Sequence, residues 1–231
     1  MGSTHSRQLP RPRPAKGPVH INEAFTRHGQ ALVLSLDALR SKNPFKNAGH
    51  AATVTDRLTG EVIFHVSAKY GGRQMITSRD GKPLLSLDVE HRAFASTKIT
   101  AYLAGESQET NPVLVAKPID SSRKVLQVMV SNRASDNGQV QFIIDCKRSG
   151  RQRGGSLTMN GVLIDYVSYD KKVDRSVSFT VPLGADALLF AAMMCCLSRM
   201  FMERDRARRR SAAAGAGGAG AGAGAGGGGG C

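Results

Sequence analysis

Hydrophobic and polar residues alternate with a period of two along most of this chain. The segments "ALVLSLD" (31–37) and "EVIFHVS" (61–67) show the pattern, which is typical of β-strands with one buried face. The pairs Asp80-Gly81 and Asn160-Gly161 fall between such segments and favour hairpin turns. The pattern predicts an antiparallel meander of about a dozen strands, and therefore a sandwich or a barrel. The predicted strands are 31–37, 50–56, 61–67, 73–78, 84–90, 97–104, 112–118, 124–131, 139–145, 162–169 and 176–182.

The period changes after the last predicted strand. Pro182 and Gly184 end that strand, and Asp186 suits the N-cap or first turn of a helix. Residues 187–198 then carry no charge, so the predicted helix, at about 185–203, would be apolar on all sides. Its large apolar side chains are Leu188, Leu189, Phe190, Met193, Met194, Leu197, Met200 and Phe201.

A helix that is apolar on all sides lies either in lipid or inside a protein. The uncharged run would extend about 18 Å at ~1.5 Å per residue, whereas the hydrocarbon core of a bilayer is about 30 Å thick. A membrane span in which Arg199 reaches the interface is the alternative. The strand count favours enclosure, because a barrel of about eleven strands can hold a central helix. We therefore expect a mainly β fold, a closed antiparallel barrel of about twelve strands that encloses the C-terminal helix.

The two ends of the chain differ from the body in composition. Residues 1–29 begin with a Pro- and Arg-rich stretch without acidic residues, and they are predicted to form a disordered basic arm. Residues 204–231 join an Arg-rich stretch to a Gly/Ala tract, and they are predicted to form a disordered tail. The barrel domain is expected at 30–203. Of the formal net charge of +14, residues 1–20 carry +4 and residues 204–231 carry another +4, which favours a polyanionic partner.

Candidate chemistry is sparse. The four cysteines lack the spacing of a zinc site, and the six histidines are scattered. Cys146 stands beside Lys147 and Arg148, whose charges favour a lowered thiol pKa, although burial in a strand is the alternative. No catalytic motif is present, so we expect no enzyme activity, no cofactor and no metal site.

Three segments carry a resemblance to a known family. They are "VTDRLTGEVIFHVSA" (54–68), "MITSRDGKPLLSLDVEHRAF" (75–94) and "VSFTVPLGADALLFAAMMCCLSRM" (177–200). These resemble the LURP-one-related proteins, which belong with the Tubby C-terminal domain and the phospholipid scramblases. The resemblance implies a twelve-stranded barrel around a hydrophobic helix over about residues 30–203. The Cys-rich and acidic calcium-binding segments of the scramblase branch are missing, so lipid scrambling is not expected.

The N-terminus offers a membrane-binding hypothesis. "MGSTHS" matches the N-myristoylation pattern at Gly2, although a plain disordered start also fits. One acyl chain binds membrane only marginally, so a second signal is needed. Arg7, Arg11, Arg13 and Lys16 would supply that signal on an anionic surface.

A second basic group lies in the predicted loop "CKRSGRQRGG" (146–155). Lys147, Arg148, Arg151 and Arg153 could bind the phosphates of a lipid headgroup. The family's Tubby relatives bind phosphoinositides, which implies the same class of ligand here. A solvated hairpin loop is the alternative. RNA binding is less favoured, because the loop has no aromatic residue to stack on bases.

Together these observations predict a non-enzymatic LURP-one-related barrel that binds anionic lipid and is tethered to membrane by its basic arm, with acylation at Gly2 left open. The alternative is a protein-interaction or regulatory module, as the defence-linked plant relatives imply, with "RDRARRR" (204–210) serving nuclear targeting. The absence of an apolar N-terminal segment predicts that the chain is not secreted, with a cytoplasmic, plasma-membrane or nuclear location. The sequence leaves the oligomeric state open.

Overall fold

The computed structural model describes residues 19–36, 50–68, 73–90, 97–105, 111–120, 124–133, 138–146, 154–169 and 177–217. Within these ranges it contains twelve strands, a short 3-10 helix and one long α-helix. Their bounds are η1 (Glu23–Phe25), β1 (Leu32–Leu36), β2 (His50–Asp56), β3 (Val62–Ala68), β4 (Gln74–Ser78), β5 (Pro83–Glu90), β6 (Lys98–Leu103), β7 (Leu114–Pro118), β8 (Val125–Asn132), β9 (Gly138–Asp145), β10 (Gly154–Met159), β11 (Val162–Tyr169), β12 (Val177–Val181) and α1 (Ala187–Gly217).

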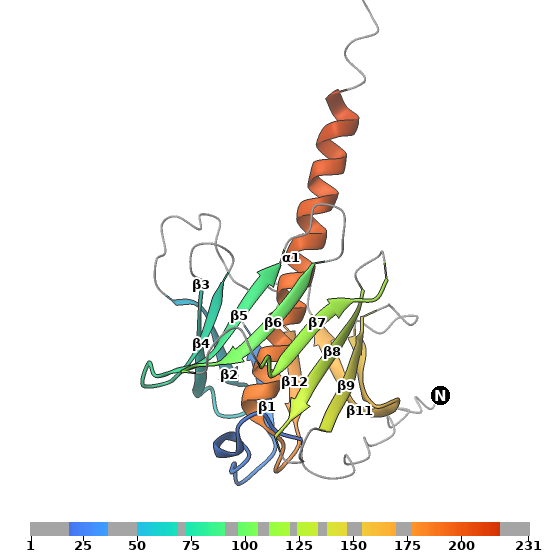
Figure 1. Ribbon diagram of the computed structural model, residues 1–231. Helices are drawn as coiled ribbons and strands as arrows, with labels where there is room; N and C mark the ends of the chain where they lie inside the picture. Colours follow the sequence, from blue (N-terminus) through green and yellow to red (C-terminus); the bar gives the residue numbers. More distant parts are fainter. Residues whose placement is uncertain are drawn as a thin grey trace, which may run out of the picture.

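The strands form one closed antiparallel barrel in chain order (Figure 1). Each strand pairs with its neighbours in sequence, and β1 closes the ring by pairing with β12 from Leu32↔Val181 to Leu36↔Val177. Closure leaves no sheet edge exposed to another chain. The predicted fold class is confirmed.

One strand, β10, was missing from the predicted set. It begins with two glycines, which weaken the alternating pattern in the sequence. The second glycine is required by packing, because a Cβ at Gly155 would clash with the carbonyl oxygen of Asp145 on β9. The turn at Asn160-Gly161 was the sequence signal for this strand. Both turn residues have positive φ, at 48° and 81°, as a type I′ hairpin requires.

The helix α1 runs through the barrel, and the strands surround its N-terminal part (Figure 1). Every residue from Ala187 to Ser198 is buried. The eight large apolar side chains predicted for the helix core are each at most 5% exposed. Alternate residues of the strands, such as Leu34 and Leu36 of β1, point inward and form one hydrophobic cluster with the helix. Enclosure by protein, and not by lipid, therefore accounts for a helix that is apolar on all sides.

The helix is longer than predicted. It continues from the barrel to Gly217, so the segment 204–210 is helical and the prediction of a disordered tail from residue 204 was wrong for this part. Arg and Ala are strong helix formers, and the buried turns before them supply the costly nucleus. The described part of the chain contains no helix that is both long and apolar enough to cross a membrane.

The predicted arm also ends earlier than residue 29. Ile21 is 1% exposed and joins the barrel core, and Asn22 caps η1 by accepting a hydrogen bond from the Ala24 amide. Residues 19–29 are therefore part of the folded domain, because an apolar side chain and a local cap stabilise them there. We call this end of the barrel, where α1 begins, the helix-entry end, and the opposite end the helix-exit end.

The enclosure of α1 makes a direct prediction for stability. Leu197→Ala should lower the free energy of unfolding by about 2–5 kcal/mol, because it leaves a cavity in the closed barrel. Chemical denaturation monitored by circular dichroism measures the change. Leu58→Ala is the matched control, because Leu58 is 68% exposed. It should change stability by less than about 0.5 kcal/mol. Equal losses in the two variants would contradict enclosure.

Candidate functional site

The carboxylate of Asp186 is the centre of the helix-entry end. One oxygen, Oδ1, accepts hydrogen bonds from the first turn of α1, from the amides of Leu188 (2.8 Å) and Leu189 (3.2 Å). The other, Oδ2, accepts from the amides of Ile21 (2.8 Å) and Asn22 (2.9 Å). One side chain therefore caps the helix, as the sequence predicted, and also holds a segment 165 residues earlier in the chain.

Burial and hydrogen bonding act on Asp186 in opposite directions. Complete burial raises the pKa of this carboxyl, whereas the four amide donors lower it, and burial is the larger effect. The raised pKa reflects the free-energy cost of burying a charged carboxylate, which the hydrogen bonds from the surrounding amides offset. The carboxylate therefore has a structural role, because the donors that the described residues direct at it are all backbone amides. We call these four hydrogen bonds the Asp186 tie.

Further contacts fix residues 19–30 across this end. The His20 amide donates to Asn132 Oδ1 (3.1 Å), and the Arg133 amide donates to the His20 carbonyl (3.0 Å). Nε2 of His28 lies 2.7 Å from the carbonyl oxygen of Ala185, just before α1. These contacts attach the segment both to the end of β8 and to the start of the helix. The start of the described chain, at Val19, therefore lies at the helix-entry end.

A second buried carboxylate, Asp56, orders the neighbouring β2–β3 turn. It is 1% exposed and accepts hydrogen bonds from the amides of Val33 (3.1 Å) and Leu58 (3.2 Å) and from the Thr59 hydroxyl (2.9 Å). Burial raises the pKa of Asp56, but its hydrogen-bond donors together lower the pKa below the ordinary value of 3.8. The turn is thus fixed against the start of β1.

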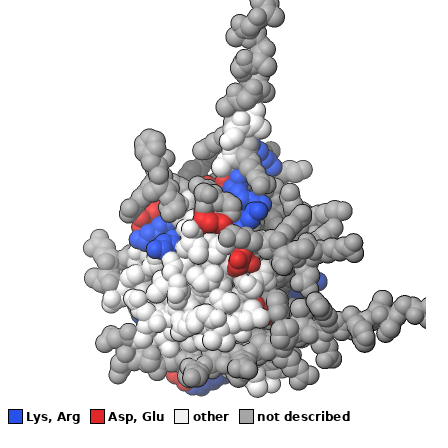
Figure 2. Space-filling view, turned by 90° about the vertical axis from the view of Figure 1, so that its right-hand side faces the viewer, with Lys and Arg blue, Asp and Glu red and all other residues white. Residues whose placement is uncertain are grey.

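At the helix-exit end, charged side chains gather around the emerging helix, while the barrel wall below is largely uncharged (Figure 2). Arg199 Nε lies 3.4 Å from Glu203 Oε1, and both side chains are only 13% exposed. The guanidinium of Arg204 lies 5.6 Å from the ring centre of Phe201, within the range of a cation–π contact. These contacts replace the hydrophobic packing of the barrel where α1 leaves it.

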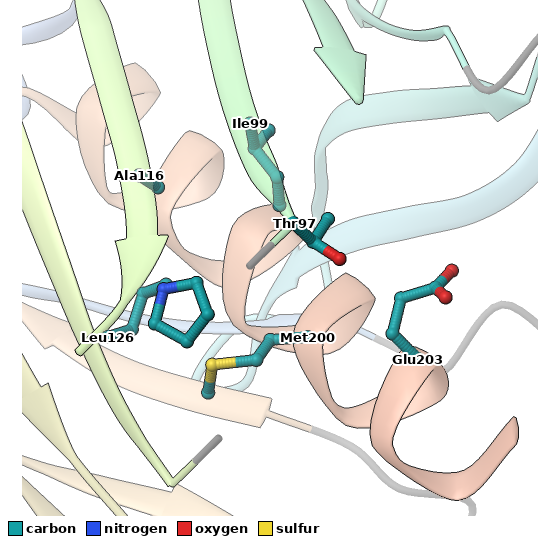
Figure 3. Close-up of a pocket in the computed structure, with 7 residues that line it drawn as sticks. Thr97, Ile99, Ala116, Leu126, Met200 and Glu203 are labelled. Carbon is teal, nitrogen blue, oxygen red and sulfur yellow. The ribbon is translucent and has the colours of Figure 1, made fainter. Parts of the chain in front are cut away.

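A shallow apolar pocket lies beside these charges (Figure 3). Met200 of α1 lies opposite Leu126 of β8, and Glu203 stands at the pocket rim. Its volume is about 240 Å³ including the part open to solvent. The lining residues are Thr97, Ile99, Ala116, Pro118, Leu126, Met200 and Glu203.

The three thiols in the described residues have raised pKa values. Burial and the nearby Asp145 together raise the pKa of Cys146 to about 12, although Arg204 partly opposes them. Burial also raises the pKa of Cys195 to about 12 and that of Cys196 well above its usual range. The expected lowering of the Cys146 pKa was therefore wrong. The alternative, burial in a strand, is not met either, because Cys146 is only half-buried and directly follows β9. Over the described ranges, no cluster of three His, Cys, Asp or Glu side chains could hold a metal ion.

Both predicted basic groups and the predicted acylation site, Gly2, lie outside the described residues. The group in the N-terminal arm is Arg7, Arg11, Arg13 and Lys16, and the group in the β9–β10 loop is Lys147, Arg148, Arg151 and Arg153. Only the described residues that flank these groups can be located. The arm leads into Val19 at the helix-entry end, whereas the loop joins Cys146, after β9, to Gly154 at the helix-exit end. The flanking residues Val19 and Cys146 therefore lie at opposite ends of the barrel.

Comparison with known proteins supports the fold alone. No protein-family profile and no curated protein sequence matches this chain. Among solved structures, the chain is similar to the X-ray structure of the Arabidopsis thaliana protein AT5G01750, with a TM-score of 0.52 and 14% sequence identity. The match covers 79% of this chain and 98% of that one. At this identity the similarity shows a shared architecture.

The Asp186 tie predicts a strong coupling between the arm and the helix. Asp186→Ala should lower the free energy of unfolding by about 2–4 kcal/mol, because four amides lose their acceptor in a buried position. It should also speed amide hydrogen exchange at residues 21–22, measured by mass spectrometry. Asp80→Ala, in an exposed turn, is the matched control and should change neither quantity. Unchanged exchange at residues 21–22 in Asp186→Ala would argue against the tie.

The lowered pKa of Asp56 predicts a pH dependence. An acid whose folded pKa is lowered stabilises the fold above its unfolded value and loses this contribution as pH falls through the folded value. Asp56→Asn should therefore cost about 1–3 kcal/mol at pH 7, and its difference from the unmodified protein should shrink below about pH 4. Urea denaturation across this range measures it, with Asp80→Asn as the control. A difference independent of pH would contradict the assignment.

Proposed function

We propose that this protein is a non-enzymatic barrel of the LURP-one-related kind that is tethered to anionic membrane by its N-terminal arm. The observation that carries the proposal is the placement of charge. Four basic residues without an acidic neighbour precede the point where the chain joins the barrel, at its helix-entry end. A basic segment of this kind is attracted to anionic lipid at about 1 kcal/mol per residue.

The family assignment is supported by the barrel and its central helix together with the three quoted segments. All three segments lie at structurally defining places. The first forms β2, its turn and β3, the second forms β4 and β5, and the third joins β12 to α1. Asp186, within the third, ties the helix to residues 21–22. The similarity to the Arabidopsis structure supports the same architecture.

The proposal that the protein is not an enzyme follows from how the barrel is filled. The lumen holds the side chains of α1, and the buried cysteines have raised pKa values. Buried Asp56 and Asp186 accept hydrogen bonds that order the backbone. These groups serve the fold, which leaves recognition to the ends of the barrel.

A second candidate function has its own observation. The helix carries the "RDRARRR" segment beyond the barrel, where Arg209 is exposed. A helix of this composition would suit an acidic protein partner or a nuclear import receptor. This favours the regulatory-module interpretation, in which the basic ends serve binding and targeting.

A vesicle flotation assay distinguishes the two. The purified chain should float with phosphatidylcholine vesicles that contain phosphatidylserine or phosphoinositide, and should not float with phosphatidylcholine alone. Replacing Arg7, Arg11, Arg13 and Lys16 with Gln should weaken flotation at least about tenfold, and salt should weaken it further. Acylation at Gly2 would strengthen flotation, and intact-mass measurement of protein from a eukaryotic host detects it.

The control replaces Lys147, Arg148, Arg151 and Arg153 with Gln, which removes the same number of charges at the other end. If this variant alone loses flotation, lipid binds at the β9–β10 loop and the arm assignment is wrong. If neither vesicle type is bound by the unmodified chain, membrane tethering is excluded and the regulatory-module interpretation remains.

A further inference from the structure

Two large hydrophobic side chains are exposed at the helix-entry end. Leu58, in the β2–β3 turn, is 68% exposed, and Leu183, between β12 and α1, is 66% exposed. Val162, at the start of β11 on the same rim, is 49% exposed. Exposed leucines that share one rim are candidates for contact with something outside the chain.

The two leucines lie on opposite sides of β1. The Arg57 amide donates to the carbonyl of Val33 on one side of β1, and Leu32 pairs with Val181 on the other side. Strands are about 4.8 Å apart, so the two turns are separated by about 10 Å. Both leucines can therefore meet one flat surface at the same time.

Both turns are ordered by buried hydrogen bonds. Asp56 holds the turn that presents Leu58. The turn that presents Leu183 is closed by a hydrogen bond from the Ala185 amide to the Pro182 carbonyl (3.0 Å), and Gly184 supplies the φ of 77° that the turn needs. The leucines are thus presented on a fixed frame, so their insertion would require little ordering.

The charges around the leucines favour an anionic surface. The exposed charged side chains described at this end comprise five basic and three acidic residues. Two of the acidic residues are paired, Glu23 with Arg27 (3.2 Å) and Glu61 with Arg79 (2.6 Å). The basic arm joins the barrel at this same rim. The five exposed basic residues described at this end are Arg27, Arg57, Arg79, Lys82 and Arg133, and the three acidic residues are Glu23, Glu61 and Asp80.

The opposite end of the barrel is less suited to a flat membrane. There α1 continues beyond the barrel and projects outward (Figure 1), by about 20 Å at ~1.5 Å per residue. This rod would hold the rim at the helix-exit end away from a bilayer. At the helix-entry end, residues 19–30 and the turns lie across the rim, and no long helix of the described residues projects from it (Figure 1).

We propose that Leu58 and Leu183 insert into the interface of an anionic lipid membrane, with the helix-entry end of the barrel facing the bilayer. This inference rests on the proposed function, since the arm brings the rim to the membrane. It adds an orientation and a hydrophobic contact that charge alone would not supply. The leucines pass into the headgroup layer while the surrounding arginines and lysine contact lipid phosphates.

The chain contains no tryptophan, so a single introduced tryptophan reports on its own position. Leu58→Trp and Leu183→Trp should show blue-shifted emission and quenching by brominated lipid on vesicles of phosphatidylcholine and phosphatidylserine. Ile119→Trp is the matched control, because Ile119 is 53% exposed and follows β7 at the helix-exit end. Its emission should not change. The double variant Leu58→Ser with Leu183→Ser should float at least tenfold less than the unmodified chain, whereas Ile119→Ser should float normally.

The outcomes separate this inference from the proposed function. If the unmodified chain floats but the Leu58 and Leu183 reporters do not shift, or Ile119→Trp shifts instead, the orientation is wrong and arm-based tethering stands. If the unmodified chain does not bind anionic vesicles, both fail. A blue shift that rises with protein concentration without vesicles would show that a second copy of the chain covers the leucines, which also overturns the inference.

Discussion

The structure depends on the enclosure of an apolar helix by a closed ring of strands. Neither part is stable alone, because an empty barrel would collapse and the bare helix would expose hydrophobic side chains to water. The ring gives every strand a hydrogen-bonded neighbour on both sides, and α1 fills the lumen with eight large apolar side chains. This mutual dependence explains why the helix lacks a polar face within the barrel and acquires charges where it leaves.

The entry of the helix into the barrel creates a second requirement. The first amides of α1 are buried and have no partners within the helix. Asp186 satisfies two of them, and its burial becomes tolerable because Ile21 and Asn22 donate to its other oxygen. The segment before β1 is thereby drawn into the fold. The point at which the N-terminal arm joins the folded domain thus follows from the capping of a helix that lies far away in the sequence.

The same geometry gives the barrel two different ends. One end is closed by turns and by residues 19–30, and the basic arm leads into it. The other is crossed by the emerging helix, with the Arg199–Glu203 pair at its mouth. Because α1 fills the lumen between them, recognition is expected at these surfaces. The proposed membrane function depends on this difference between the two ends of the barrel and not on a pocket.

The sequence by itself determined the alternating strands, the apolar helix and its Asp186 cap, because each follows from local periodicity or from neighbours within a turn. It also predicted the closed barrel, from the strand count and from a helix that needed enclosure. It missed β10, whose Gly155 only makes sense against Asp145, and it placed residue 204 in a disordered tail. Only the tertiary structure decided that Val19 and Cys146 lie at opposite ends of the barrel and that Leu58 and Leu183 share a rim. These relations depend on pairing between distant segments, which periodicity does not report.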